Sequence, residues 1–181
     1  MKDMKYYLKV TLSLLLICTV VAGLLSAVNA LTADHIAQNA QRQREQAVSA
    51  IFPDMSSMLD TNGAWLEGVH AVYAVYENDA QIGYAVDLDV RGFGGDVNMI
   101  VGIGANGTVC GVRVVSHSET PGLGSRAMIS DYLDNFIGVG ESLTVGEDLD
   151  AVSGATISSK AVVSGINLAL SLGLGGVAAH G

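Results

Sequence analysis

The first feature in the pattern of hydrophobic and polar positions is an uninterrupted apolar run near the N-terminus. Val10–Leu31 holds 22 residues without a charged side chain. A helix of about 20 apolar residues crosses the hydrocarbon core of a bilayer, so residues 10–31 are predicted to form a transmembrane helix. A cleaved signal peptide, with Val28-Asn29-Ala30 as its cleavage site, is the alternative, although the apolar part of such a peptide is usually about 7–15 residues long. A buried helix of a soluble domain is the third interpretation.

The charges that precede this run predict its orientation. Residues 1–9 contain three lysines and one aspartate, a local charge of +2. Basic residues favour the cytoplasmic side of a membrane, so residues 1–9 are expected in the cytoplasm and the chain from residue 32 on outside it. The anchor and the signal-peptide interpretations agree on this topology. With an uncleaved anchor, the protein is a single-pass protein of the cell membrane.

The segment after the apolar run is predicted to be helical. Residues 32–51 are rich in alanine and glutamine and contain neither glycine nor proline. We expect a helix that Pro53 ends and that continues from the membrane helix as a stalk. Residues 53–68 hold turn signals, so 32–68 is assigned as helical stalk and linker.

An alternation with a period of two residues begins near residue 69 and predicts β-strands. Val86, Leu88 and Val90 alternate with Asp87 and other charged residues, which is typical of a strand with one buried and one solvated face. Asn78-Asp79 and Asn106-Gly107 are turn signals, the second a strong hairpin signal. The strands are expected over 69–76, 84–91, 99–103 and 108–116.

Helical spacing returns in the last third of the chain. Ser125 is a good N-cap for a helix over Arg126–Ile137, and a second helix is expected over Ile157–Leu172. Antiparallel strands followed by helices predict an α+β fold, with helices packed on one face of an antiparallel sheet. The domain is assigned to residues 69–175, followed by a flexible tail at 176–181.

Charge and composition narrow the function. Residues 32–181 hold 6 basic and 17 acidic residues, a net charge of −11, which excludes non-specific binding of nucleic acid. Cys18 and Cys110 make neither a disulfide framework nor a zinc site, and metal binding by the side chains is not expected. Any redox chemistry must come from a bound cofactor.

Two segments carry candidate chemistry. His117–Gly124 follows a predicted strand, and its glycines would let a ligand approach the backbone, with Leu123 available to pack on a ring. Asp150–Lys160 runs from small residues into a helix start, where free N–H groups and the helix dipole favour an anion and the Thr156 hydroxyl could contact, or be esterified to, a phosphate. Each segment also has a purely structural interpretation: a strand-to-helix turn for the first, and an N-cap by Ser153 or Thr156 for the second.

These residues resemble the motifs of a known family. Ser153-Gly-Ala-Thr156 is similar to the S-G-A-T motif of covalent FMN-binding domains, and His117–Gly124 is similar to their H-x-E-T-P-G-L-G segment. Arg91–Gly95 resembles their R-G-[YF]-G-G turn. With the N-terminal membrane helix, residues 1–175 resemble the G subunits of Rnf electron-transport complexes.

The resemblance implies a cofactor and its site. One FMN would be bound covalently, as a phosphoester of Thr156, and a separate flavin transferase would install it from FAD with Mg²⁺. Ser153, Gly154 and Ala155 would supply close backbone and small side chains around the phosphate. The flavin itself would be lined by Glu119, Thr120, Gly122 and Leu123.

The resemblance also implies a function. The chain would be a membrane-anchored electron-transfer subunit of an ion-translocating ferredoxin:NAD oxidoreductase complex, with other membrane and soluble subunits as partners and no catalysis of its own. Within the wider family, the C subunit of the Na⁺-translocating NADH:quinone reductase is the alternative. Outside it, the alternatives are a membrane-anchored binding or scaffold module without flavin and a flavin reductase that acts alone.

Overall fold

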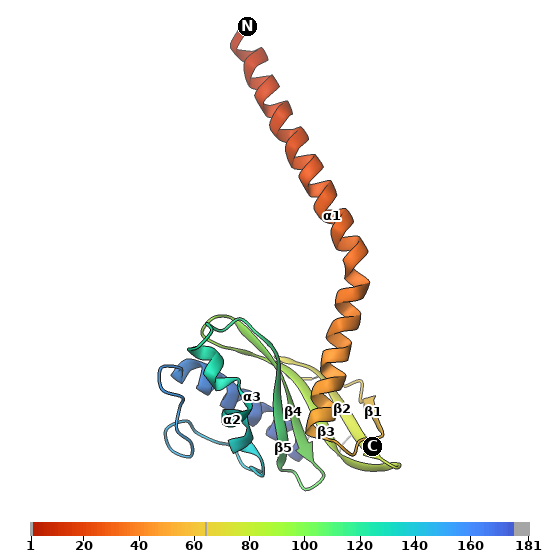
Figure 1. Ribbon diagram of the computed structural model, residues 1–181, viewed down its shortest axis with the longest axis vertical. Helices are drawn as coiled ribbons and strands as arrows, with labels where there is room; N and C mark the ends of the chain where they lie inside the picture. Colours follow the sequence, from red (N-terminus) through yellow and green to blue (C-terminus); the bar gives the residue numbers. More distant parts are fainter. Residues whose placement is uncertain (1, 64, 176–181) are drawn as a thin grey trace. The chain divides into compact units, whose positions relative to one another are not determined.

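The computed structural model describes residues 2–63 and 65–175 (Figure 1). The chain divides into two compact units, Met1–Arg42 and Gln43–Gly181. One helix, α1 (Lys2–Ile51), runs through the boundary between them, so the predicted membrane helix and stalk belong to a single helix. The predicted tail, 176–181, lies outside the described residues.

The first unit contains the apolar part of α1. Tyr6–Ala33 has a mean hydropathy of 2.4 over its most apolar window, and none of that window is buried within the structure. It is the one helix of the described chain that is long and apolar enough to cross a membrane. Helix α1 ends at Ile51, just before Pro53, as predicted.

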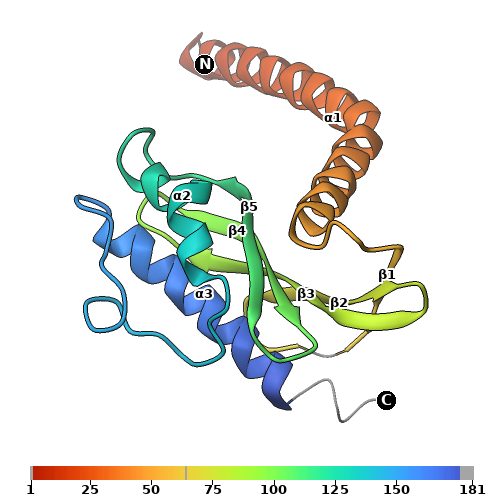
Figure 2. The same cartoon turned by 60° about the horizontal axis from the view of Figure 1, so that its bottom comes forward.

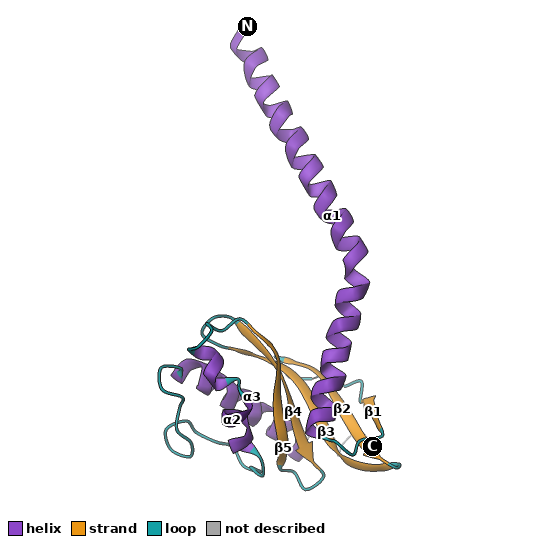
Figure 3. Cartoon of the chain, in the orientation of Figure 1, coloured by secondary structure: helices purple, strands orange, loops and turns teal. Residues whose placement is uncertain are grey.

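The second unit is built on a five-stranded antiparallel sheet, whose strands follow the order of the sequence (Figure 3). The strands are β1 (Ser57–Asp60), β2 (Val69–Glu77), β3 (Ala80–Arg91), β4 (Asp96–Gly104) and β5 (Val109–His117). Strands β2 to β5 confirm the four predicted strands. Strand β1 was not predicted, because its four residues are mostly exposed and show no alternation.

Tight turns connect the central strands. Glu77 pairs with Ala80 across the β2–β3 hairpin, and the two residues between them, Asn78 and Asp79, have φ values of 45° and 68°. Two consecutive residues with positive φ are typical of the type I′ turn, whose twist matches that of the flanking strands. Gly107, with φ of 80°, closes the β4–β5 connection as predicted.

One face of the sheet carries the main core. Helix α3 (Thr156–Gly175) packs there (Figure 2), with Ile166 and Leu170 fully buried among apolar residues of β3 and β4 such as Leu88 and Met99. Gly165 permits this close approach, because a Cβ there would lie 2.9 Å from the Met99 sulfur. The predicted α+β fold is therefore confirmed.

The helix predicted over 126–137 is wrong, because the segment forms three short elements. These are η1 (Gly124–Ala127), α2 (Ser130–Leu133) and η2 (Asp134–Phe136). Ile129 between them has an extended backbone and is 51% exposed, so the apolar residues do not form one straight stripe. Ser125 is not an N-cap: it lies inside η1, and its hydroxyl accepts a hydrogen bond from the Gly122 N–H at 2.9 Å.

The opposite face of the sheet is also covered, which corrects the expectation of a solvated face and of helices on one face only. Val48, Ile51 and Phe52, from the end of α1 and the residue after it, form a second cluster with Val75 and Ile100 and their neighbours. Ile51 and Phe52 pack against glycines on three adjacent strands, because a Cβ on any of these glycines would contact Ile51 or Phe52. The glycines are Gly83, Gly102 and Gly111.

The burial of Asp87 is a consequence of this covered face. Asp87 is 1% exposed, and the Arg44 Nε atom of α1 donates to its Oδ2 atom at 2.7 Å. The Asn98 amide donates to Asp87 Oδ1 at 2.8 Å and to Asp89 Oδ1 at 2.9 Å. His70 Nε2 lies 2.7 Å from the other oxygen of Asp89, so the buried carboxylate belongs to a network that reaches solvent.

Candidate functional site

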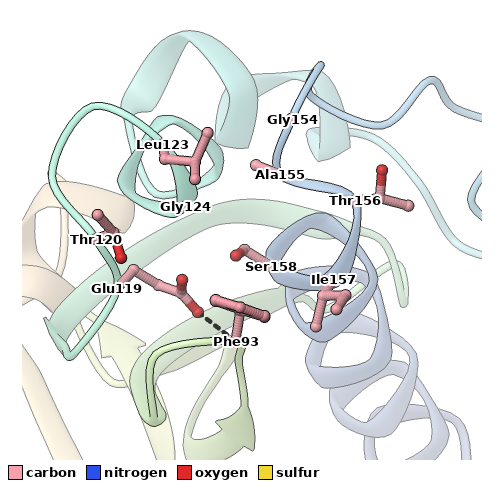
Figure 4. Close-up of a pocket in the computed structure, with 10 residues that line it drawn as sticks. All are labelled: Phe93, Glu119, Thr120, Leu123, Gly124, Gly154, Ala155, Thr156, Ile157 and Ser158. Carbon is pink, nitrogen blue, oxygen red and sulfur yellow. Dashed lines mark hydrogen bonds between the residues drawn. The ribbon is translucent and has the colours of Figure 1, made fainter.

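Three segments far apart in the sequence meet around one cavity of about 290 Å³ (Figure 4). They are the β3–β4 turn, the loop after β5 and the start of α3. All three contain the motifs identified in the sequence. The lining residues are Phe93, Glu119, Thr120, Leu123, Gly124, Gly154, Ala155, Thr156, Ile157 and Ser158.

Glu119 lies at the inner end of this cavity. Its side chain is 4% exposed, and its Oε1 atom accepts hydrogen bonds from the backbone N–H groups of Phe93 at 2.7 Å and Gly94 at 3.3 Å. The Oε2 atom is buried and has no hydrogen-bond partner among the described residues. A buried acceptor without a partner is costly, and here it lines a cavity that can admit a donor.

Glycines allow the three segments to close around Glu119. A Cβ on Gly92 or on Gly124 would overlap the Glu119 carboxylate, and one on Gly124 would also lie 2.8 Å from the Ser158 hydroxyl. A Cβ on Gly94 would overlap the Ser118 carbonyl. The glycines of the turn and of the loop are thus required by close packing.

The start of α3 also lines the cavity. The Ala155 N–H donates to the Val152 carbonyl at 2.8 Å, and Gly154 between them has φ of 80°, a value that favours glycine. Thr156 is the first residue of α3, and its side chain is exposed. The first N–H groups of a helix have no intrahelical partner, so an anion at Thr156 would meet free donors and the favourable end of the helix dipole.

The hydroxyl that fixes this turn is neither of the two expected caps. Ser159 Oγ accepts a hydrogen bond from the Val152 N–H at 3.1 Å. Tyr132 packs behind it; its hydroxyl is buried and makes no hydrogen bond of good geometry within the described residues. Burial raises the pKa of Tyr132, and the nearby Ser159 hydroxyl opposes the rise.

The rim of the cavity is apolar. Phe93 is 68% exposed, Ile157 54% and Leu123 45%, although all three line the cavity. Leu123 also bridges two of the segments, because its Cδ1 atom would lie 3.1 Å from a Cβ on Gly154. Large apolar side chains exposed around a cavity suit a flat, hydrophobic ligand that would cover them.

Six of the eight residues predicted for the site line the cavity, and two do not. Ser153 lies just before the lining residues, and Gly122 has a φ of 76° and open space beside it. Four lining residues were not predicted. Phe93 and Gly124 belong to motifs that the sequence had already indicated, and Ile157 and Ser158 follow directly after Thr156.

These features fit FMN. The apolar rim suits the ring, the unpartnered Glu119 oxygen can accept a hydrogen bond from a ring N–H group, and the Thr156 hydroxyl at a helix start suits the phosphate. The described residues hold no group of three or more histidine, cysteine, aspartate or glutamate side chains that could bind a metal ion.

Comparisons with known proteins agree with this fit. Residues 92–171 match the model of the FMN-binding domain, and residues 1–51 match that of the RnfG N-terminal region. The G subunit of the proton-translocating ferredoxin:NAD(+) oxidoreductase complex of Clostridium ljungdahlii is 29% identical, over 93% of this chain and 92% of its own length. The G subunit of the ion-translocating oxidoreductase complex is 31% identical in Escherichia coli K12, over 81% of both chains, and 29% identical in Methanosarcina acetivorans, over 94% of this chain and 96% of that one. The chain thus belongs to the family of G subunits of ion-translocating oxidoreductase complexes, as a membrane-anchored redox subunit with an FMN-binding domain.

Proposed function

We propose that this chain carries electrons through one FMN attached covalently to Thr156, within a complex that couples ferredoxin:NAD oxidoreduction to ion translocation. The observation that carries the proposal is the convergence of three glycine-bearing segments on a cavity that Thr156 lines. The names of the related G subunits support the reaction of the whole complex.

Different residues of the cavity would bind different parts of the cofactor. Thr156 Oγ1 would form the phosphoester, and the first N–H groups of α3 would stabilise its negative charge. Glu119 Oε2 would accept a hydrogen bond from the ring, while Phe93, Leu123 and Ile157 would shield the ring from water. When bound, FMN supplies redox chemistry that no side chain of this chain offers.

Attachment requires a second protein, a flavin transferase. The Thr156 hydroxyl would attack the phosphorus on the flavin side of the FAD pyrophosphate, so that an O–P bond forms, the bridging P–O bond breaks, and AMP leaves with the electron pair. The hydroxyl proton would pass to a base of the transferase, and Mg²⁺ would neutralise the charge on the pyrophosphate. The exposure of Thr156 supports this role, because the enzyme must reach the hydroxyl.

The basic N-terminus supports a topology in which residues 1–9 are cytoplasmic and the FMN domain lies outside the cytoplasm, in the cell membrane. A reversibly bound cofactor would be lost there by dilution, and a covalent bond prevents the loss. The apolar run of α1 holds no ionisable group other than the Cys18 thiol. An ion path is therefore assigned to partner subunits, because such paths require polar groups within the membrane.

The test is the intact mass of the full chain extracted from membranes of cells that make the transferase. Native protein should carry one FMN and remain fluorescent at its own mass after denaturation. Thr156→Ala or Thr156→Val should carry none, Thr156→Ser should carry some, and the exposed control Thr144→Val should carry as much as the native chain. Covalent FMN on Thr156→Val, or a native chain without flavin, as expected of a scaffold module, would refute the proposal.

A further inference from the structure

The cations of the FMN domain are distributed unevenly. Of the five Lys and Arg residues between positions 43 and 175, three pair with carboxylates: Arg44 with Asp87, Arg91 with Asp96, and Arg113 with Asp134. The other two, Arg126 and Lys160, make no ion pair within the described residues and are exposed. Both lie on elements that bound the cavity, η1 and α3. In a domain with a large acidic excess, unpaired cations beside one cavity indicate an anionic ligand.

The position of Lys160 is the more informative of the two. It follows Thr156 by four residues in α3, so the two side chains lie on the same face of the helix, about 5–6 Å apart at Cβ. Long side chains in a helix lean towards its N-terminus, which directs Lys160 towards the turn that starts with Thr156. Lys160 does not line the cavity but a neighbouring depression with Leu143 and Val163. It therefore approaches Thr156 from outside the cavity, whereas Glu119 lies at the inner end.

We infer that Lys160 holds the phosphate of the flavin nucleotide at Thr156 by its positive charge, both before attachment and in the finished phosphoester. The inference rests on the proposed function, which places that phosphate at Thr156. It adds that two parts of the domain bind two parts of the cofactor: the cavity binds the ring, and Lys160, outside the cavity, binds the phosphate. Arg126 belongs to η1, next to the Leu123 wall of the cavity, and has no such geometric relation to Thr156.

The test compares two ligands that differ only in the phosphate. The full chain, made without a flavin transferase and purified in detergent, is titrated with FMN and with riboflavin, and the change in flavin fluorescence is measured. The native chain should bind FMN more tightly than riboflavin. Lys160→Gln should weaken FMN binding about fivefold, which corresponds to about 1 kcal/mol for an exposed charge pair, and should leave riboflavin binding unchanged.

Two variants and a salt series serve as controls. Lys160→Arg should keep the preference for FMN, because it keeps the charge, and Arg126→Gln should keep it too. In about 1 M salt, where the screening length is about 3 Å, the difference between the native chain and Lys160→Gln should largely disappear. An equal loss in Arg126→Gln would overturn the assignment to Lys160, as would equal weakening of both ligands by Lys160→Gln.

Failure of the inference about Lys160 can be distinguished from failure of the proposed function. A native chain that binds neither ligand, or binds both equally, overturns the role of Lys160, while covalent FMN at Thr156 would still be detected by intact mass. The absence of covalent FMN from native protein made with the transferase would instead refute the proposed function.

Discussion

Replacing Arg44 by methionine tests whether the end of α1 is held on the sheet by its ion pair with Asp87. The substitution keeps an unbranched stem and removes the donor that lies 2.7 Å from a carboxylate that is 1% exposed. Breaking a buried pair by removing one partner costs about 3–5 kcal/mol. The Arg44 side chain is 32% exposed, and Asn98 still donates to Asp87. We therefore expect the free energy of unfolding to fall by about 2–3 kcal/mol.

The assay is urea unfolding of the full chain in detergent, followed by the fluorescence of Trp65, the single tryptophan, which packs against the main core. The exposed pair of Arg91 with Asp96 provides the control, and Arg91→Met should change the unfolding free energy by less than about 0.5 kcal/mol. The double variant Arg44→Met with Asp87→Asn should recover most of the loss, because no buried charge remains unpaired. A loss below about 0.5 kcal/mol in Arg44→Met would refute the reasoning.

Other substitutions test the cavity, the core and the topology. Gly124→Ala should lower the free energy of unfolding by about 1–3 kcal/mol, because its methyl would overlap the Glu119 carboxylate. Gly140→Ala, whose Cβ would lie 3.3 Å from the Thr108 methyl group and 3.8 Å from the Gly107 carbonyl oxygen, should cost much less in the same urea titration. Glu119→Gln should weaken the noncovalent binding of FMN and riboflavin alike, since it replaces the unpartnered acceptor by a donor; a loss confined to FMN would contradict a role at the ring. Burial raises the pKa of Tyr132 above its usual value near 10, so its contribution to stability is complete below that value and is lost as the pH rises above it. Tyr132→Phe should therefore change the free energy of unfolding at pH 7 by less than about 0.5 kcal/mol. It should also reduce the fall of this free energy between about pH 9 and 11, measured by urea titration; an unchanged fall would exclude Tyr132 as its source. A cysteine introduced by Thr144→Cys should react with a membrane-impermeant maleimide on intact spheroplasts, and reaction only after lysis would reverse the proposed topology.

The parts of the fold that could be predicted from the sequence depend on local signals. The alternation of Val86, Leu88 and Val90 with charged residues indicates one buried face of β3 without information from any other segment. Asn78 and Asp79 tolerate positive φ, so they mark the β2–β3 turn by themselves. Strand β1 has no comparable signal, because its pairing with β2 depends on an edge that only the folded sheet provides.

The features that could not be predicted depend on contacts between distant segments. The charged side of β3 was expected in water, and Asp87 is buried only because the end of α1 lies over it with Arg44. The helix expected over 126–137 breaks at Ile129, whose backbone is extended. At β3 the apolar residues were identified correctly, but the surface that covers its charged side was unknown. At 126–137 the assumption of one continuous helix was wrong, since Ile129 is 51% exposed.

The same distinction between local signals and contacts of distant segments applies to the candidate site. Thr156 could be chosen from the sequence, because it lies at a predicted helix start that favours a phosphate, whereas Glu119 was chosen through the resemblance of its segment to a family motif. The close contact of the β3–β4 turn with Glu119 through the Phe93 N–H group could not, because 26 positions separate the two residues. The structure supplies this contact and thereby joins the three motifs in one cavity.

The cover that the end of α1 provides for the second face of the sheet decides where a water-soluble fragment of this protein should begin. A truncation at Pro53 would remove the whole membrane helix, but it would also remove Val48 and Ile51 and leave Ile100 and its neighbours open to solvent. It would also strip Asp87 of its cation. A fragment that starts at Gln43 or earlier keeps these residues, so the last turns of α1 belong to the folded domain as much as to its anchor.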